Sequence, residues 1–129
     1  IHLEKTKKSL SVVSDQISSP TYAVDFSRNL VEIIKKIYLE HKEKPFQEIF
    51  HYSNTGTTSW HNFAKEIFNL MNINIDIKKI DTKNLELNAN RPCNSSLNSK
   101  KITDFFDIKI ETWKDSLINC VNNYQKANL

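Results

Sequence analysis

Glycine and cysteine are both scarce in this chain. Among 129 residues there is one glycine, Gly56, so the sequence has no glycine-rich loop of the kind that holds the phosphates of a dinucleotide or a nucleoside triphosphate. Its two cysteines, Cys93 and Cys120, do not have metal-site spacing and are too few for a disulfide-built scaffold. We therefore expect reduced thiols and a cytoplasmic protein.

Long apolar runs are also missing. No run approaches the roughly 20 residues that a membrane span needs, and residues 1–5 do not resemble a signal peptide. The chain starts at Ile1 rather than Met, which suggests that a preceding part has been removed. The net charge of +3 comes almost entirely from scattered lysines. Such a distribution favours a small anionic ligand over nucleic acid.

The hydrophobic pattern predicts one domain, residues 1–129, of a small α/β (α+β) type with a few short, partly parallel strands packed by helices. Ser19 and Pro20 have the residue types of an N-cap and a first helical position, and Thr58 or Ser59 can cap a second helix. Thr112 and Asp115 have the spacing of a capping box. We expect strands over 10–13, 48–52 and 73–80, and helices over 20–40, 59–71, 99–106 and 113–124, with a helical turn near Leu85.

Catalytic and metal-binding patterns are not apparent. The four histidines are not grouped as zinc ligands, no serine lies in a nucleophile elbow, and the aspartates form no recognisable acid–base pair. Tyr38 and Lys42 have the spacing of a reductase Tyr-xxx-Lys pair, but Tyr38 falls on the apolar side of a long helix, which favours a structural role. These residues predict a binding domain with no catalytic or metal-ligating residue of its own.

One loop has residues suited to binding an anion. Arg91, one of two arginines, precedes Pro92, which restricts Arg91 to an extended backbone, and Asn90, Asn94 and Ser95 are close by. A guanidinium held in this way can offer paired donors to a phosphate or a carboxylate. The alternative is a polar surface loop whose arginine pairs with a neighbouring carboxylate or helix end.

Three sequence blocks, in this order, resemble one known family. They are VSDQISSPTYAVD at residues 13–25, HYSN-G--SWHNFA at 51–64, and ANRP-NS-L at 89–97, and the closing WKDSL at 113–117 is similar as well. Together they resemble the C-terminal substrate-binding lobe of dTDP-4-dehydrorhamnose reductases, which are extended short-chain dehydrogenases/reductases. The resemblance covers nearly the whole chain from Leu10 onward.

The resemblance implies a parent protein that reduces dTDP-4-dehydro-6-deoxy-L-mannose to dTDP-L-rhamnose with NADPH, for O-antigen and other lipopolysaccharide precursors. The absent N-terminal Rossmann lobe would bind NADPH and supply the catalytic tyrosine and lysine, so this chain alone should be inactive. By position in the family motifs, Arg91 would contact the pyrophosphate of the dTDP-sugar. Gln16, Ser19 and Thr21 would line the sugar or phosphate side, and Asn94 and Ser95 would hold the Arg91 loop.

Two other interpretations stay open at this stage. The chain could belong to a non-catalytic interaction subunit similar to the regulatory β subunit of methionine adenosyltransferase, which resembles the same reductases. It could also be an unrelated α/β binding module that shares short sequence words with the family. The partners expected under the first interpretation are the dTDP-sugar and the N-terminal lobe, and a homodimer is compatible with it; nucleic acid and membrane are not expected.

Overall fold

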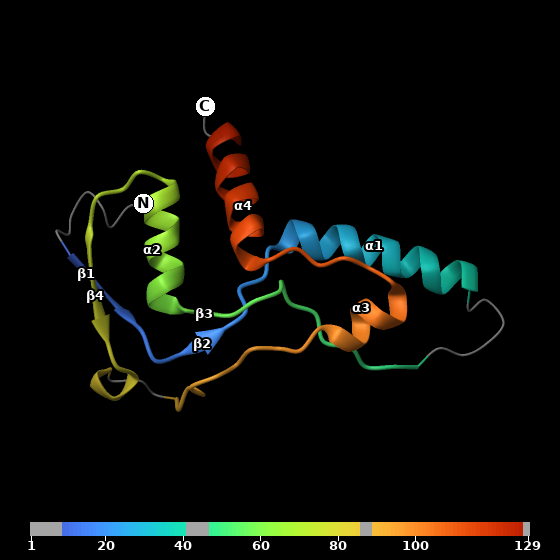
Figure 1. The fold of residues 1–129 in the computed structure, drawn as a ribbon, viewed down its shortest axis with the longest axis horizontal. Helices are drawn as coiled ribbons and strands as arrows, with labels where there is room; N and C mark the ends of the chain where they lie inside the picture. The colour runs from blue at the N-terminus through green and yellow to red at the C-terminus, as the bar shows by residue number, and fades with distance from the viewer. Residues whose placement is uncertain (1–8, 41–46, 86–88, 128–129) are drawn as a thin grey trace.

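The fold was analysed in a computed structural model, which describes residues 9–40, 47–85 and 89–127. This part of the chain contains four α-helices and two small two-stranded sheets (Figure 1). The longest helix, α1 (Ala23–Glu40), extends away from the sheet formed by β1 (Ser9–Val13) and β4 (Asp76–Ile80), which lies at the other end of the molecule. The predicted mixture of helices and short, partly parallel strands is confirmed.

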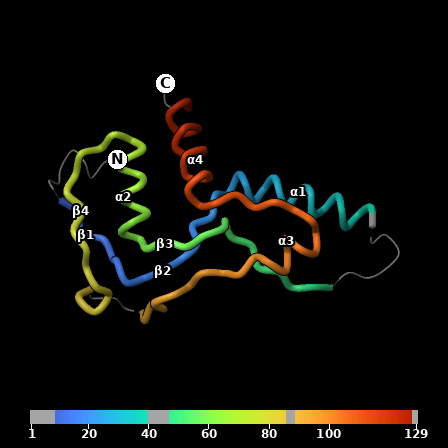
Figure 2. The backbone as a smooth tube through the Cα atoms, in the orientation of Figure 1, coloured from blue at the N-terminus to red at the C-terminus, as the bar shows by residue number. Residues whose placement is uncertain are grey.

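Strands β1 and β4 pair in parallel, with Ser9 opposite Asp76 and Val13 opposite Ile80. Parallel strands need a long crossover, and here the chain forms α1 and α2 (Trp60–Leu70) before it returns as β4. Helix α2 lies beside this sheet (Figure 2). The buried His61 on α2 has its Nε2 3.3 Å from the Ile77 carbonyl of β4, which ties the helix to the sheet.

The second sheet is antiparallel and joins β2 (Ile17–Ser18) to β3 (Thr58–Ser59). Ser59 is also the N-cap of α2, because its hydroxyl accepts a hydrogen bond from the Asn62 amide at 3.2 Å. Before β3, Gly56 has φ +83°, a conformation that L-residues rarely adopt. The predicted cap of α2 is therefore present.

The buried apolar residues form two clusters. Ile33 of α1 packs with Ile102 and Phe106 of α3 (Lys100–Phe106) and with Ile110. The second cluster joins α4 (Trp113–Ala127) to α2, and its buried members are Trp113, Leu117 and Val121. Helix α4 begins with the expected capping box, in which Thr112 donates to the Asp115 carboxylate at 2.6 Å and accepts from the Asp115 amide at 3.2 Å.

A buried polar network is centred on Asn54, whose exposed fraction is 1%. Its Oδ1 accepts from the Tyr22 amide at 2.8 Å, and its Nδ2 donates to the Glu111 carbonyl at 3.1 Å and to Ser116 Oγ at 2.8 Å. Ser116 in turn donates to the buried carboxylate of Asp25 at 2.5 Å. The start of α1, the turn before β3 and helix α4 are thereby held together.

The expected strand over residues 48–52 is wrong. Side chains do alternate there, because Phe50 and Tyr52 pack against the first cluster while Ile49 and His51 are exposed. The segment is not a strand, however, since no strand among the described residues lies beside it to supply a hydrogen-bond ladder. Lysine and serine side chains take part of that role: Lys101 donates to the Ile49 carbonyl at 3.1 Å, and the Ser53 amide donates to Ser99 Oγ at 2.9 Å.

Two further expectations about the helices need correction. Helix α1 starts at Ala23, so Ser19 and Pro20 precede it and Ser19 is not its N-cap. The apolar residues of α1 also occupy more than the face that packs on α3, because Leu30 and Ile34 are 39% and 56% exposed. Trp60, the first residue of α2, is exposed as well. Elsewhere the turn near Leu85 is a short 3-10 helix, η1 (Thr82–Asn84).

Candidate functional site

The Arg91 loop is attached to the segment that contains Gln16. The Ile17 amide donates to the Cys93 carbonyl at 2.8 Å, and the Ser95 amide donates back to the Ile17 carbonyl at 2.9 Å. Ile17 and Asn94 form an isolated parallel bridge, and Ser95 Oγ lies 3.3 Å from the Ile17 carbonyl. The structure therefore brings together three of the predicted site residues, Gln16, Asn94 and Ser95, on two segments far apart in the sequence.

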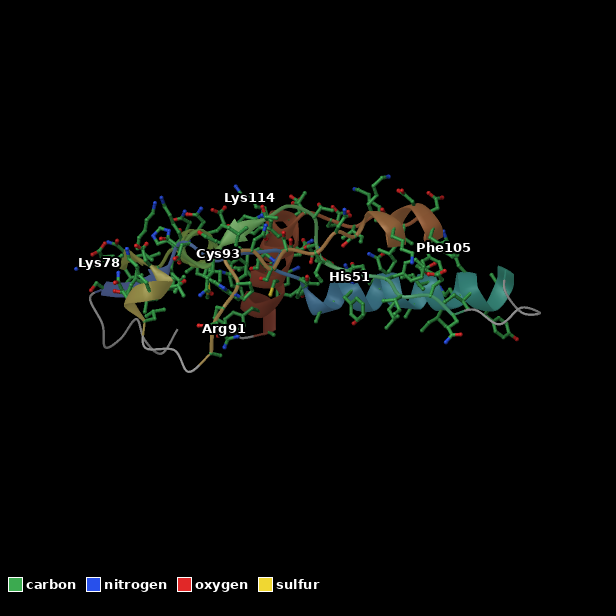
Figure 3. The ribbon with its side chains drawn as sticks, turned by 90° about the horizontal axis from the view of Figure 1, so that it is seen from below. His51, Lys78, Arg91, Cys93, Phe105 and Lys114 are labelled. Carbon is green, nitrogen blue, oxygen red and sulfur yellow. The ribbon has the colours of Figure 1, made fainter. Side chains whose placement is uncertain are left out.

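Arg91 lies at the start of this loop and is exposed. Figure 3 shows it at the edge of the molecule opposite Lys114. Within residues 9–40, 47–85 and 89–127, its guanidinium has no ion pair or hydrogen bond. The alternative in which Arg91 pairs with a carboxylate of the described part of the chain is therefore not what the structure contains. Among the described residues, nothing occupies its donors.

Asn94 and Ser95 stabilise the loop rather than project freely from it. Asn94 Oδ1 accepts from the Ser96 amide at 3.0 Å and from the Ser96 hydroxyl at 2.7 Å, which closes an Asx turn directly after the bridge to Ile17. The backbone amide of Ser95 donates a hydrogen bond to the Ile17 carbonyl. This arrangement fits the expectation that these two residues hold the loop.

Gln16 belongs to a hydrogen-bonded set at the carboxyl ends of β1 and β4. Its Nε2 lies 3.0 Å from Thr82 Oγ1, and the Asp15 carboxylate accepts from the Thr82 amide at 3.0 and 3.1 Å and from the Thr82 hydroxyl at 2.7 Å. The hydrogen bond from the Thr82 side chain lowers the pKa of Asp15, and the nearby Lys83 charge acts in the same direction. Sequence reasoning missed Asp15 and Thr82, because nothing local signals a contact across 67 positions.

Ser19 and Thr21 lie further along the same segment and line different hollows. Ser19 borders a polar hollow of about 440 Å³ together with the 53–57 turn and residues 96–100. Thr21 borders a smaller apolar hollow of about 90 Å³ beside Trp113 and Cys120. Its hydroxyl donates to the Ser19 carbonyl at 3.3 Å. Of the six predicted residues, Gln16, Asn94 and Ser95 therefore lie around Ile17, with Arg91 at the start of the same loop. Ser19 and Thr21 lie further along the chain toward α1.

Metal-binding side chains do not gather in the described part of the chain: residues 9–40, 47–85 and 89–127 contain no group of three or more His, Cys, Asp or Glu side chains that could hold an ion. Cys93 and Cys120 are free thiols. No helix of the described part is long and apolar enough to span a membrane.

Comparison with known proteins gives one consistent result. The family model described as RmlD substrate binding domain matches residues 1–126. The dTDP-4-dehydrorhamnose reductase of Aggregatibacter actinomycetemcomitans is 33% identical over 126 residues, which are 92% of this chain and 42% of that protein. The chain therefore spans about two fifths of the length of the relatives it matches.

Solved structures agree with the sequence match. The dTDP-4-dehydrorhamnose reductase ortholog of Clostridium acetobutylicum has a TM-score of 0.81 and 30% identity, over 96% of this chain and 41% of that one. The dTDP-4-dehydrorhamnose reductase of Bacillus anthracis, in complex with NADP, has a TM-score of 0.78 and 29% identity, over 90% and 38%. The chain therefore belongs to the RmlD substrate binding domain family, the family of the dTDP-4-dehydrorhamnose reductases.

Proposed function

We propose that this chain is the C-terminal, substrate-binding lobe of a longer reductase that converts dTDP-4-dehydro-6-deoxy-L-mannose to dTDP-L-rhamnose with NADPH. The observation that carries the proposal is the Arg91 loop, which backbone hydrogen bonds at Ile17 fix beside Gln16 while the guanidinium stays exposed. The family match over residues 1–126 supports it. The interpretation as a regulatory subunit is not favoured, because the relatives compared above are named dTDP-4-dehydrorhamnose reductases.

In this proposal Arg91 binds the pyrophosphate of the dTDP-sugar. Its planar guanidinium can form two parallel, charge-assisted hydrogen bonds to phosphate oxygens, and Pro92 limits the backbone freedom that binding would otherwise remove. Asn94 and Ser95 hold the loop, while Gln16, Ser19 and Thr21 line the path of the sugar nucleotide. No residue of this chain is proposed as catalytic, and the isolated chain is expected to have no reductase activity.

The proposal assigns NADPH to the remainder of the protein. The glycine turn of this chain does not suit a dinucleotide, because a Cβ at Gly56 would lie 3.1 Å from Trp113 Cδ1, so the turn faces an indole and not an open phosphate site. A Rossmann lobe would hold the cofactor together with the tyrosine and lysine that act in the reduction. The exposed apolar face of α1, with Leu30, Val31 and Ile34, supports packing of that lobe against this helix.

Synthesis of a nucleotide sugar for surface polysaccharides, such as O-antigen and other lipopolysaccharides, is the cellular role proposed with this activity. A cytoplasmic location is proposed with it, because NADPH and nucleotide sugars are used there and because Cys93 and Cys120 are free thiols.

The test is dTDP binding by calorimetry to the intact protein that contains this chain, at fixed ionic strength. Arg91→Ala should weaken dTDP binding by about 10- to 100-fold, since it removes charge-assisted hydrogen bonds. Arg91→Lys should recover only part of the affinity, because an ammonium lacks the paired donors. Lys126→Ala removes one positive charge from an exposed position near the end of α4 and is the control. Equal affinities for wild type and Arg91→Ala would contradict the assignment.

A further inference from the structure

Asp15, Thr82 and Gln16 form a hydrogen-bond relay whose donors and acceptors can be counted. Asp15 follows β1, and Thr82 follows β4, the strand that pairs with β1. The carboxylate oxygens of Asp15 lie 3.0 and 3.1 Å from the Thr82 amide, and one of them lies 2.7 Å from Thr82 Oγ1. Gln16 Nε2 is 3.0 Å from the same Oγ1.

Chemistry fixes the direction of each bond. An ionised carboxylate can only accept, so the Thr82 hydroxyl donates its single proton to Asp15. Oγ1 then has only lone pairs to offer Gln16, and the amide atom that faces it must be the nitrogen. The lowered pKa of Asp15 keeps the carboxylate ionised at neutral pH. Asp15 and Thr82 therefore determine which way the Gln16 amide is turned.

The amide held in this way presents its Oε1 and one remaining N–H away from Thr82. Oε1 is an acceptor, and an ionised pyrophosphate carries no proton to donate to it. An imide N–H of a pyrimidine base and a sugar hydroxyl both carry such a proton. The Arg91 guanidinium offers only donors, and the loop that carries it is fixed to Ile17, the residue that follows Gln16.

We propose that Gln16 is a specificity-determining residue whose Oε1 accepts a hydrogen bond from the neutral part of the nucleotide sugar, a base N–H or a sugar hydroxyl, with Asp15 and Thr82 as its positioning residues. This inference rests on the proposed function and divides the ligand between two neighbouring groups. Arg91 takes the charged pyrophosphate, and Gln16 takes a group that carries a proton.

The experiment compares Thr82→Val with Thr82→Ser in the intact protein that contains this chain. Valine removes only the hydroxyl and keeps the amide that Asp15 accepts from, whereas serine keeps both. In proton–nitrogen NMR spectra of the free protein, the Gln16 side-chain amide should shift in Thr82→Val and return in Thr82→Ser. Gln16→Met, which keeps the length of the side chain, removes the acceptor directly and keeps the test open if Thr82→Val fails to fold.

Calorimetry then measures inorganic pyrophosphate, dTDP and dTDP-L-rhamnose. Thr82→Val should weaken binding by about fivefold and Gln16→Met by about tenfold for a ligand with the recognised donor, and neither should affect pyrophosphate. A loss already seen with dTDP assigns the donor to the nucleoside, and a loss confined to dTDP-L-rhamnose assigns it to the sugar.

The inference would be overturned by any of three results. The variants could weaken pyrophosphate binding as much as dTDP-sugar binding, or Gln16→Met could leave the affinity for every ligand unchanged. The third is a Gln16 side-chain amide signal that does not shift in Thr82→Val. These outcomes differ from a failure of the proposed function, in which wild-type protein would not bind dTDP at all.

Discussion

The Asn54 side chain makes three hydrogen bonds that the sequence did not predict. The side chain satisfies the Tyr22 amide, the Glu111 carbonyl and the Ser116 hydroxyl, and almost none of it reaches solvent. Buried backbone groups left without partners are costly, since water cannot replace what was lost. Asn54→Ala should therefore lower the free energy of unfolding by about 3 kcal/mol, measured by urea denaturation.

Asn122→Ala is the matched control for that variant, because Asn122 is exposed on α4. It should change the stability by less than about 0.5 kcal/mol. If the two variants unfold at the same urea concentration, the network around Asn54 does not hold the helices together as described.

Asp15 should make the stability of the protein depend on pH in the acid range. Because the Thr82 hydrogen bond lowers its pKa in the folded state, its contribution is present above the ordinary carboxyl pKa of about 4 and is lost as the pH falls through the lower, folded value. Asp15→Asn should therefore show a smaller fall in melting temperature between pH 6 and pH 3 than wild type. A fall as large as that of wild type would contradict the role given to this carboxylate.

Local residue patterns predicted caps better than contacts. Ser59 and Thr112 could be identified because the atoms they bind lie three positions away. Asn54 and Thr82 could not, since their partners are separated from them by 32 to 67 positions and depend on how helices and strands assemble. The Arg91 loop was identifiable as a motif, but its attachment to Ile17 was not.

At the scale of elements, α1 has apolar residues on two faces. Ile33 is buried against α3, while Leu30, Val31 and Ile34 lie on the exposed side. Periodicity alone cannot separate these two faces, because i, i+3 and i+4 spacing does not say how wide the buried sector is. The same limit applies to residues 48–52, whose alternation is strand-like although no strand pairs with them in the described part of the chain.

Ile34→Ser tests the second face of α1. If the remainder of the reductase covers this face, the variant should lower the free energy of unfolding of the intact protein by about 2 kcal/mol, since it removes buried apolar area. Lys35→Ser, at the next position, has an exposed side chain and is the control. Chemical denaturation of both variants gives the comparison, and equal stabilities would place Ile34 in solvent in the intact protein too.

The whole molecule has a small core for its length. The described part of the chain has seven buried apolar residues, which form two clusters. A chain with this much exposed apolar surface on one helix should self-associate when it is expressed alone. We expect the 129-residue chain to bind a hydrophobic dye and to elute earlier from a sizing column as its concentration rises.

The intact protein should neither bind the dye nor self-associate if, as proposed, a further lobe covers this surface. A monomeric 129-residue chain without dye binding would show that the α1 face needs no cover.

The link from Asp25 to Ser116 also sets an order of events during synthesis. The two residues are 91 positions apart. At about 5 to 20 residues per second, roughly 5 to 20 s pass between the emergence of Asp25 and that of its partner. Throughout that interval the carboxylate in the first turn of α1 lacks its Ser116 partner and can pair only with Arg28 of the same helix, so the contact between α1 and α4 forms late. Slow codons downstream would lengthen this wait, and chaperones that recognise aliphatic segments have that time in which to act.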